Sequence, residues 1–265
     1  MKSTVKNILT FLLFTLFFVG CTDSTKDSLT DPTLKKATGD KKAIELAKKV
    51  IEASGGKKNW DNIPYISFDY FGRRYWFWDK FNNRYRVESE HRNLIAAGTL
   101  DGKETYMNFN DEEVTHPDSL SKFNELAYRM WINDTYWLIF PFKLLDPGVK
   151  LKYLGNCSTD SINATCIELT FEKVGITPGN RYVAYIDKES YDVVKWDYYE
   201  NADDPKPTMS NKWDEYSQYG PVRLSRGRGK VRLGEVIIYE TLPEEIFTDV
   251  SRSYKDIIGA STKLN

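Results

Sequence analysis

Histidine is nearly absent from this chain of 265 residues, in which only His91 and His116 occur. Because imidazole is the commonest metal ligand of proteins, two residues exclude a multi-histidine metal centre. An excess of charge is also missing, since 37 Lys and Arg residues face 38 Asp and Glu residues, for a formal net charge of -1. Nucleic-acid-binding proteins normally carry a clear basic excess, so the composition argues against a nucleic-acid partner.

The apolar run near the N-terminus is too short to span a membrane. It extends over twelve residues, Ile8–Val19, whereas a membrane-spanning helix needs about 20. Lys2 and Lys6 precede it and Gly20 follows it, an order typical of a secretory signal peptide, which we place at residues 1–20. Its removal takes away two basic residues and no acidic one, so the net charge becomes -3.

Residues 18–21, Phe-Val-Gly-Cys, resemble the bacterial lipobox, in which the cysteine is lipidated and becomes the first residue of the mature chain. Phe18 departs from the pattern, in which leucine is usual. An ordinary signal peptide or a short N-terminal anchor is the alternative. With Cys21 lipidated, residues 21–39, rich in Thr, Ser, Asp and Lys, are predicted to form a flexible tether. We therefore expect a lipid-anchored protein of the cell envelope, at the outer membrane on its periplasmic or surface side.

Cysteine is scarce, and its spacing is informative. Besides Cys21 the chain has only Cys157 and Cys166, on either side of a polar, turn-like stretch with strand-like segments before and after it. Outside the cytoplasm a disulfide across such a hairpin is permitted, and we predict one. Two free thiols are the alternative.

The remaining chain, residues 40–265, reads as a single domain that is mainly β. Asp40–Ser54 is the clearest helix, since its apolar residues fall on one stripe, and Asp118–Trp131 has a similar spacing. About a dozen short strands make up most of the rest, with no alternation of strand and helix. A parallel sheet is therefore disfavoured, and we expect a curled antiparallel sheet with helices.

The most unusual segment is Tyr136–Leu145, in which only Lys143 is charged. We predict a short helix that begins near Asn133 or Asp134 and ends at Pro141. A helix apolar on every side is either a core helix beneath a sheet or part of the wall of a ligand cavity. The candidate cavity residues, which include two aromatic residues of a strand, are Trp76, Trp78, Tyr136, Trp137, Ile139, Phe140 and Phe142.

Two further segments invite a functional interpretation. In Arg73–Asp79, strand alternation places Trp76 and Trp78 on one face and Tyr75 and Phe77 on the other. One face could line a cavity or stack on sugars; otherwise both are covered by protein. Arg226–Lys230 resembles a basic RNA-binding fragment or a phosphate loop, but a strand follows it where a phosphate loop requires a helix. We predict a solvated hairpin turn there.

Signs of catalysis are few. No Gly-x-Ser-x-Gly elbow is present, and adjacent acidic residues such as Asp203 and Asp204 would point to opposite faces of a strand. No catalytic residue, metal site or cofactor is predicted, and we do not expect an enzyme.

Several stretches together resemble a known group of proteins. They are Ala53–Gly56 with Trp60, Asn133–Leu138, Pro141–Leu144 with Asp146–Gly148, and Tyr182–Trp196. This set resembles a family of uncharacterised lipoproteins from Bacteroidetes-type bacteria, which is similar, more distantly, to the lipoprotein-localisation carriers LolA and LolB. The resemblance covers nearly all of residues 40–250. It implies a half-barrel whose concave side is plugged by helices, and it supplies no catalytic residues.

The functional expectation follows from these features together. In the carriers the half-barrel holds acyl chains, so we expect a lipid, an acyl chain or another apolar ligand to bind in the concave side without catalysis. The alternatives are a glycan-binding or protein-interaction module of the envelope and, third, a hydrolase acting on glycans or lipids.

Overall fold

The structure, a computed structural model, describes residues 36–159, 162–172 and 174–264. The predicted signal peptide, Cys21 and most of the predicted tether lie outside these residues. The end of the tether segment lies inside them, where Thr38–Gly39 forms strand β1 and pairs in parallel with β8. All the other strand pairs are antiparallel, and the fold is mainly β, as predicted.

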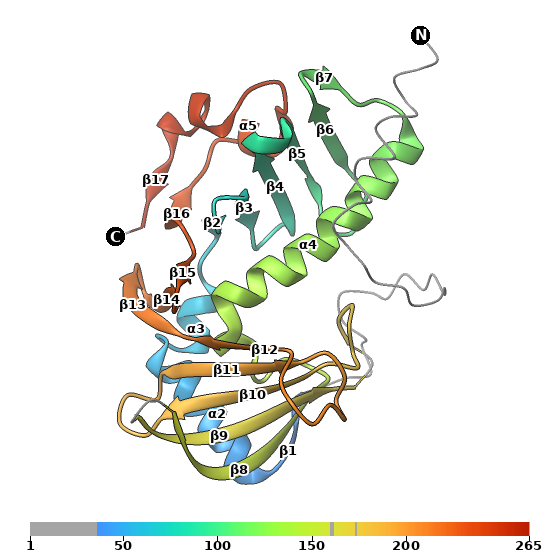
Figure 1. Cartoon of the computed structure of the whole chain (residues 1–265). Coiled ribbons are helices and arrows are strands. Elements are labelled where there is room, and N and C mark those ends of the chain that lie inside the picture. Colours follow the sequence, from blue (N-terminus) through green and yellow to red (C-terminus); the bar gives the residue numbers. More distant parts are fainter. Residues whose placement is uncertain (1–35, 160–161, 173, 265) are drawn as a thin grey trace.

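An eight-stranded sheet forms the upper part of the molecule in Figure 1. Its strand order is β17-β16-β2-β3-β4-β5-β6-β7. The strands β2 to β7 follow one another as consecutive hairpins, and two strands from the C-terminal end of the chain are added beside β2. The strands are β2 (Tyr65–Tyr70), β3 (Arg74–Asp79), β4 (Arg84–Ser89), β5 (Leu94–Thr99), β6 (Thr105–Phe109), β7 (Glu112–Glu113), β16 (Val236–Thr241) and β17 (Thr262–Lys263).

A six-stranded sheet of order β1-β8-β9-β10-β11-β12 forms the lower part, and a small sheet of β13, β14 and β15 lies between the two (Figure 1). The long hairpin β8–β9 carries both remaining cysteines. The strands are β8 (Val149–Thr159), β9 (Ile162–Phe171), β10 (Arg181–Asp187), β11 (Val193–Tyr199), β12 (Met209–Lys212), β13 (Asp214–Tyr219), β14 (Val222–Arg228) and β15 (Val231–Arg232).

Helix α2 (Lys41–Ala53) covers one face of the six-stranded sheet, and its predicted apolar stripe is buried there. The helix ends where Gly55 and Gly56 take φ values of 106° and 86°, which residues with a Cβ rarely adopt. A short helix α3 (Lys57–Asp61) follows and buries Trp60 against the eight-stranded sheet.

Helix α4 (Pro117–Lys143) is the element that joins the two sheets. Figure 1 shows it running obliquely across the eight-stranded sheet and down to the six-stranded sheet. Its first half packs in the core of the upper sheet through Phe123 and Trp131, and Phe140 near its end packs in the core of the lower sheet. The prediction that a separate short helix begins near residue 133 is therefore wrong, because these residues continue the helix that begins at Pro117. The helical conformation is interrupted at Ile139, two residues before the predicted end at Pro141, so that α4 consists of two helical stretches joined by a kink.

The outer face of the eight-stranded sheet is covered by the C-terminal segment, which includes the short helix α5 (Glu245–Thr248). Arg86, fully buried, holds this segment by donating hydrogen bonds to the backbone carbonyls of Ile246 and Asp249, and it pairs with Glu88 at 2.6 Å. With both faces covered, the sheet has an interior side under α4 and an exterior side under the C-terminal segment. No helix in the described parts of the chain is long and apolar enough to cross a membrane.

Candidate functional site between α4 and the sheets

The interior side of the eight-stranded sheet is lined by aromatic residues that meet α4. Trp78 of β3 lies edge-on to Trp131 of α4, with ring centroids 4.9 Å apart, and Trp60 stacks on Phe142 at 4.8 Å. Aromatic rings bury large apolar areas and fit together in such offset and edge-on arrangements. This lining is the most apolar surface that the fold assembles, and it decides where an apolar ligand could be bound.

Strand β3 confirms the predicted division of its aromatic residues. Trp76 and Trp78 face α4, whereas Tyr75 and Phe77 lie under the C-terminal segment, where Tyr75 stacks on Tyr254 at 4.5 Å. Both faces of the strand are thus covered by protein. A sugar-stacking platform needs an open aromatic face, and β3 offers none.

A buried ion pair fastens the middle of α4 to the sheet. Asp134, with no exposed surface, accepts hydrogen bonds from Arg74 Nε at 2.7 Å and Nη2 at 2.9 Å, and from Trp76 Nε1 at 2.8 Å. Burial raises the pKa of the Asp134 carboxyl, although Arg74 acts in the opposite direction. The bidentate geometry satisfies the carboxylate, so it fixes the position of α4 at this point.

The end of α4 is held by a second arginine, because Pro141 lies inside the helix. A proline has no N–H to donate to the carbonyl four residues earlier, which is that of Trp137. Ile139 leaves the helical conformation (φ -111°, ψ 18°), and Arg228 Nη2 donates to the freed Trp137 carbonyl. Arg228 therefore replaces the hydrogen bond that Pro141 removes.

The prediction of a solvated hairpin turn at residues 226–230 is confirmed only for Gly229 and Lys230, which form an exposed turn between β14 and β15, and is wrong for Arg228. Arg228 belongs to β14 and is only 3% exposed, and its guanidinium lies 3.6 Å from the centre of the Trp213 ring. Burial lowers the pKa of Arg228 to about 9. The sequence pattern suggested exposure because glycine and basic residues are usual in turns, but the break in α4 needs a buried donor.

The structure distributes the seven candidate cavity residues over two cores. Four lie in the core beneath the eight-stranded sheet: Trp76, Trp78, Ile139 and Phe142. Phe140 lies in the core of the six-stranded sheet with Tyr136 packed against it, and Trp137 packs against both cores. Two surface clefts, of about 290 and 130 Å³, are lined by none of the seven.

Several buried polar atoms in these cores have no hydrogen-bond partner among the described residues. They include the indole N–H groups of Trp78 and Trp131 in the first core, and in the second the Tyr136 hydroxyl and the indole N–H groups of Trp196 and Trp213. Buried donors are nearly always paired in proteins, and each unpaired one costs free energy. Trp78 and Trp131 come from opposite walls of one interface, so an acceptor oxygen between the walls could satisfy both.

Lys80 stands beside this aromatic lining, in the turn between β3 and β4. Its Nζ lies 3.9 Å from the centre of the Trp60 ring and 6.0 Å from that of Trp78, and it donates to the Trp60 carbonyl. Burial lowers the pKa of Lys80 to about 7, with Lys57 and Lys143 acting in the same direction and Asp61 opposing them. Sequence analysis missed this lysine, since a lone Lys in a turn carries no signal until the turn is folded against Trp60.

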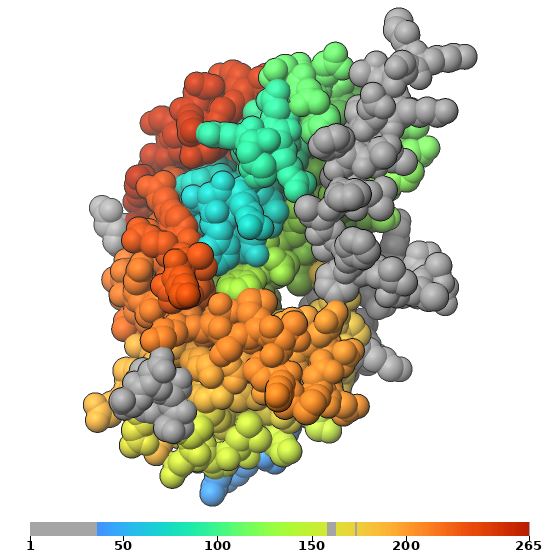
Figure 2. Space-filling model, viewed as in Figure 1, coloured from blue at the N-terminus to red at the C-terminus, as the bar shows by residue number. Residues whose placement is uncertain are grey.

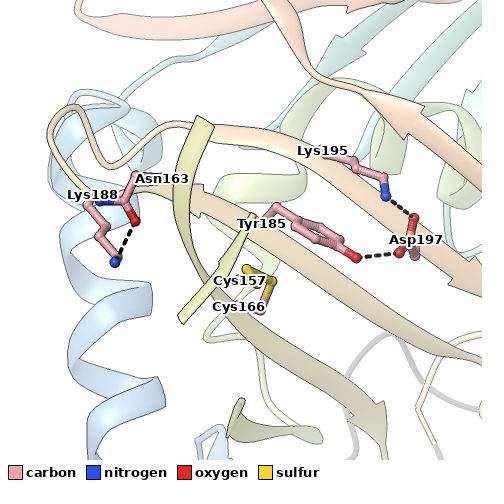
Figure 3. Close-up of a disulfide and its surroundings, with 7 residues drawn as sticks. All are labelled: Cys157, Asn163, Cys166, Tyr185, Lys188, Lys195 and Asp197. Atoms are coloured by element: carbon pink, nitrogen blue, oxygen red, sulfur yellow. Dashed lines mark hydrogen bonds and ion pairs between the residues drawn. A yellow bond between two sulfur atoms is a disulfide. The ribbon is translucent and has the colours of Figure 1, made fainter. Parts of the chain in front are cut away.

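Of the two predicted cysteine sites, the disulfide lies within the described residues and the lipidated Cys21 does not. Cys157 and Cys166 form a disulfide with their sulfur atoms 2.03 Å apart, across the hairpin β8–β9 (Figure 3). Cys21 lies outside the described residues, and its lipidation stays a prediction. His91 and His116 are both exposed, and the described residues contain no group of three or more His, Cys, Asp or Glu side chains that could hold a metal ion.

No family model matches this sequence, and no protein of curated function is significantly similar to it. Among solved structures, the chain is similar to a protein domain from Vibrio parahaemolyticus that is named for outer membrane lipoprotein sorting, at 11% identity and a TM-score of 0.42, with 80% of this chain and 99% of that chain covered.

Two further structures share the arrangement. A DUF1329 family protein from Desulfovibrio piger is 10% identical, with 78% and 97% of the two chains covered and a TM-score of 0.43. A LolA superfamily protein from Nitrosomonas europaea is 11% identical, with 77% and 97% covered and a TM-score of 0.37. The last of these structures is named for the superfamily that the sequence resembles.

Proposed function

We propose that this chain is a lipid-anchored protein of the cell envelope that binds an anionic amphiphile, such as a fatty acid, between α4 and the eight-stranded sheet, without chemical conversion. The observation that carries the proposal is the pair of unpaired indole N–H groups of Trp78 and Trp131, which lie edge-on to each other, with the Lys80 ammonium group 6.0 Å from the centre of the Trp78 ring. Lys80 would attract the anionic end, the two indoles would donate to its oxygens, and the aromatic lining would take up the acyl chain.

Access to this interface requires the first half of α4 to move away from the sheet. In that half, the Asn124 side-chain carbonyl accepts a hydrogen bond from the Tyr85 hydroxyl of β4 at 3.0 Å, and His116 at the start of the helix provides no side-chain cap. The second half is fixed by Asp134 and Arg228. The kinked helix would thus open at one end and stay attached at the other.

Fluorescence quenching tests this proposal directly. The mature chain with Cys21→Ser is titrated with dibromostearate and, in parallel, with stearate, since bromine quenches tryptophans that the chain contacts. We expect saturable quenching by the brominated acid alone. Trp78→Phe together with Trp131→Phe removes both indole N–H groups while keeping aromatic rings. It should weaken binding by about a hundredfold or more, since two hydrogen bonds to a charged group are lost and each contributes about 1.5 kcal/mol or more.

A matched control is Trp213→Phe, which removes an unpaired indole N–H group from the second core. It should leave the affinity for the fatty acid unchanged. Quenching that does not saturate, or the same loss of affinity in the control as in the double variant, would exclude a specific amphiphile site at the first core. Native mass spectrometry of protein purified from its own envelope should in addition show a co-purifying acyl species.

A further inference from the structure

A second feature of the molecule faces solvent, beside α2 and the six-stranded sheet. A cleft of about 290 Å³ runs between α2 and the neighbouring strands β8, β9 and β10. Three lysines line it: Lys42 and Lys49 from α2, and Lys188 from the turn after β10. Tyr153 and Tyr191 form its walls, with the Nζ of Lys42 at 5.6 Å from the first ring and that of Lys49 at 4.9 Å from the second.

The lysines of the cleft are free of carboxylate partners within the described residues. Lys49 Nζ donates to the Tyr191 hydroxyl at 3.2 Å, and Lys188 Nζ to the Asn163 side-chain carbonyl at 2.7 Å (Figure 3). Both partners are neutral, so the positive charges stay uncompensated. Each ammonium group has donors left over for an anionic ligand, because a lysine carries three N–H groups.

The two acidic residues of the cleft are engaged with other groups. The Asp187 carboxylate accepts backbone N–H bonds from Glu189 and Ser190, which lowers the pKa of that carboxyl. Glu45 lies 4.0 Å from Lys41 on the exposed side of α2. Neither forms an ion pair with a lysine of the cleft, and the three lysines outnumber the two carboxylates, so that the local charge is positive by one.

The surrounding surface is basic as well. Residues 36–58 contain seven lysines, no arginine and three acidic residues, in a chain whose net charge is -1. All seven lysines are exposed. Figures 1 and 2 place the beginning of this segment, coloured blue, at the lower end of the molecule, opposite the red C-terminal part. Five of the seven lysines, Lys36, Lys41, Lys42, Lys48 and Lys49, belong to the first part of this segment, from which the chain continues toward its N-terminus.

The distance to the predicted lipid is limited by the chain. Sixteen residues lie between Cys21 and Thr38, so that even a fully extended chain places these two residues no more than about 60 Å apart. A single acyl anchor binds membranes weakly, and a basic patch that meets anionic headgroups is the usual second contribution. A basic segment close to the anchor is the part of the domain that can reach the bilayer.

We propose that the cleft formed by Lys42, Lys49, Lys188, Tyr153 and Tyr191 is a binding site for the anionic headgroup of a phospholipid, and that it docks α2 onto the membrane surface. The ammonium groups would contact the phosphate, and the tyrosine rings would lie at the level of the headgroups, where aromatic residues with one polar end are favoured. The site shares no residue with the amphiphile site between α4 and the sheet. The two proposals can therefore fail separately.

Vesicle sedimentation provides the test. The mature chain carrying Cys21→Ser, so that no lipid is attached, is sedimented with vesicles of phosphatidylglycerol mixed with phosphatidylcholine and with vesicles of phosphatidylcholine alone. We expect binding to the anionic vesicles only, weakened by salt. The variant Lys42→Glu, Lys49→Glu, Lys188→Glu should bind about a hundredfold more weakly, since each lysine near the surface contributes about one kcal/mol, and tenfold corresponds to about 1.4 kcal/mol.

The matched control changes three exposed lysines elsewhere, Lys206→Glu, Lys230→Glu and Lys263→Glu, and so shifts the net charge by the same amount. It should retain most of the binding. Equal losses in the two triple variants would mean attraction by net charge alone and would overturn the proposal, as would equal binding to phosphatidylcholine vesicles.

An NMR titration locates the ligand. Short-chain phosphatidylglycerol should shift the backbone amides of Thr165 and Ile186, which line the cleft, whereas glycerol phosphate at the same concentration should shift them far less. Shifts confined to other residues would exclude the cleft. Equal shifts with glycerol phosphate would identify a site for soluble phosphates and overturn membrane docking.

Discussion

At the scale of single residues, Lys80 links burial to pH. Burial lowers its pKa to about 7 in the folded chain, whereas an exposed lysine of the unfolded chain titrates near 10.4. Between these values the unfolded chain binds more protons than the folded one, so this residue makes stability rise with pH from about 7 to 10. Below pH 7 both states are protonated and the full cost of burying the charge is present.

Lys80→Met should therefore stabilise the protein, by roughly 1–4 kcal/mol at pH 6, where a pKa difference of one corresponds to about 1.4 kcal/mol. It should also flatten the rise of stability between pH 7 and 10. Urea unfolding at a series of pH values measures both effects. Lys58→Met, at an exposed position, is the control and should change neither. A variant as stable as the wild type at pH 6 would mean that the ammonium group is well solvated.

The Arg74–Asp134 pair is the other residue-scale feature with a measurable consequence. Arg74→Ala leaves the fully buried Asp134 carboxylate without its cation, and breaking a buried pair on one side costs about 3–5 kcal/mol. Lys57→Ala breaks the exposed Lys57–Asp61 pair, and should cost less than about 1 kcal/mol. Both losses of unfolding free energy follow from the midpoints of urea unfolding curves, provided that the dependence of the free energy on urea concentration has the same slope in each variant. Equal costs would show that Asp134 does not depend on Arg74.

At the scale of elements, the kink in α4 depends on a contact between two distant segments. Pro141→Ala returns an N–H group that can donate to the Trp137 carbonyl, so Arg228 is no longer needed for that bond. Arg228→Met should therefore be more destabilising in the wild type than in the Pro141→Ala background, with a coupling free energy of about 1 kcal/mol. A double-mutant cycle by urea unfolding measures it.

Arg226→Met supplies the comparison, since Arg226 also belongs to β14 but donates to the Gly234 carbonyl, away from α4. Its effect should add to that of Pro141→Ala without coupling. If Arg228→Met combines additively with Pro141→Ala as well, the arginine is held by its other contacts, with Trp213 and Ser225, and not by the broken helix.

The elements also show how far the sequence could predict this fold. Local patterns were sufficient where one element decides its own structure: the stripe of α2 and the alternation of β3 have the faces that periodicity assigned. They failed where a partner from elsewhere was needed. A proline normally ends a helix. Next to Pro141 the helix is interrupted at Ile139 but then continues to Lys143, and Arg228, 87 residues after Pro141, pairs with the carbonyl that the proline leaves free. The roles of Lys80 and Asp134 could not be predicted either, because each depends on a partner distant in the sequence: Trp60 for Lys80 and Arg74 for Asp134.

At the scale of the whole molecule, charge and apolar surface are separated. The apolar, aromatic surface is enclosed between α4 and the sheets, whereas the lysines gather around α2, at the end where the chain continues toward Cys21. This separation suits a protein that meets a membrane surface with one end and keeps an apolar interior apart from it. The two contributions to membrane attachment, a lipid and a basic surface, should differ in their response to salt.

The predicted lipid on Cys21 can be tested through that difference. The wild-type chain, expressed with its signal peptide, should stay in the membrane fraction after a high-salt wash, because the inserted acyl chains are held by apolar burial. Cys21→Ser should remain with the membranes only at low salt, held by the lysines of α2, and should be released at high salt, since ionic attraction is screened within about 3 Å at 1 M. Adding Lys42→Glu, Lys49→Glu and Lys188→Glu should release it at low salt too. A Cys21→Ser chain that is processed like the wild type and resists the high-salt wash would show that another segment holds the protein to the membrane.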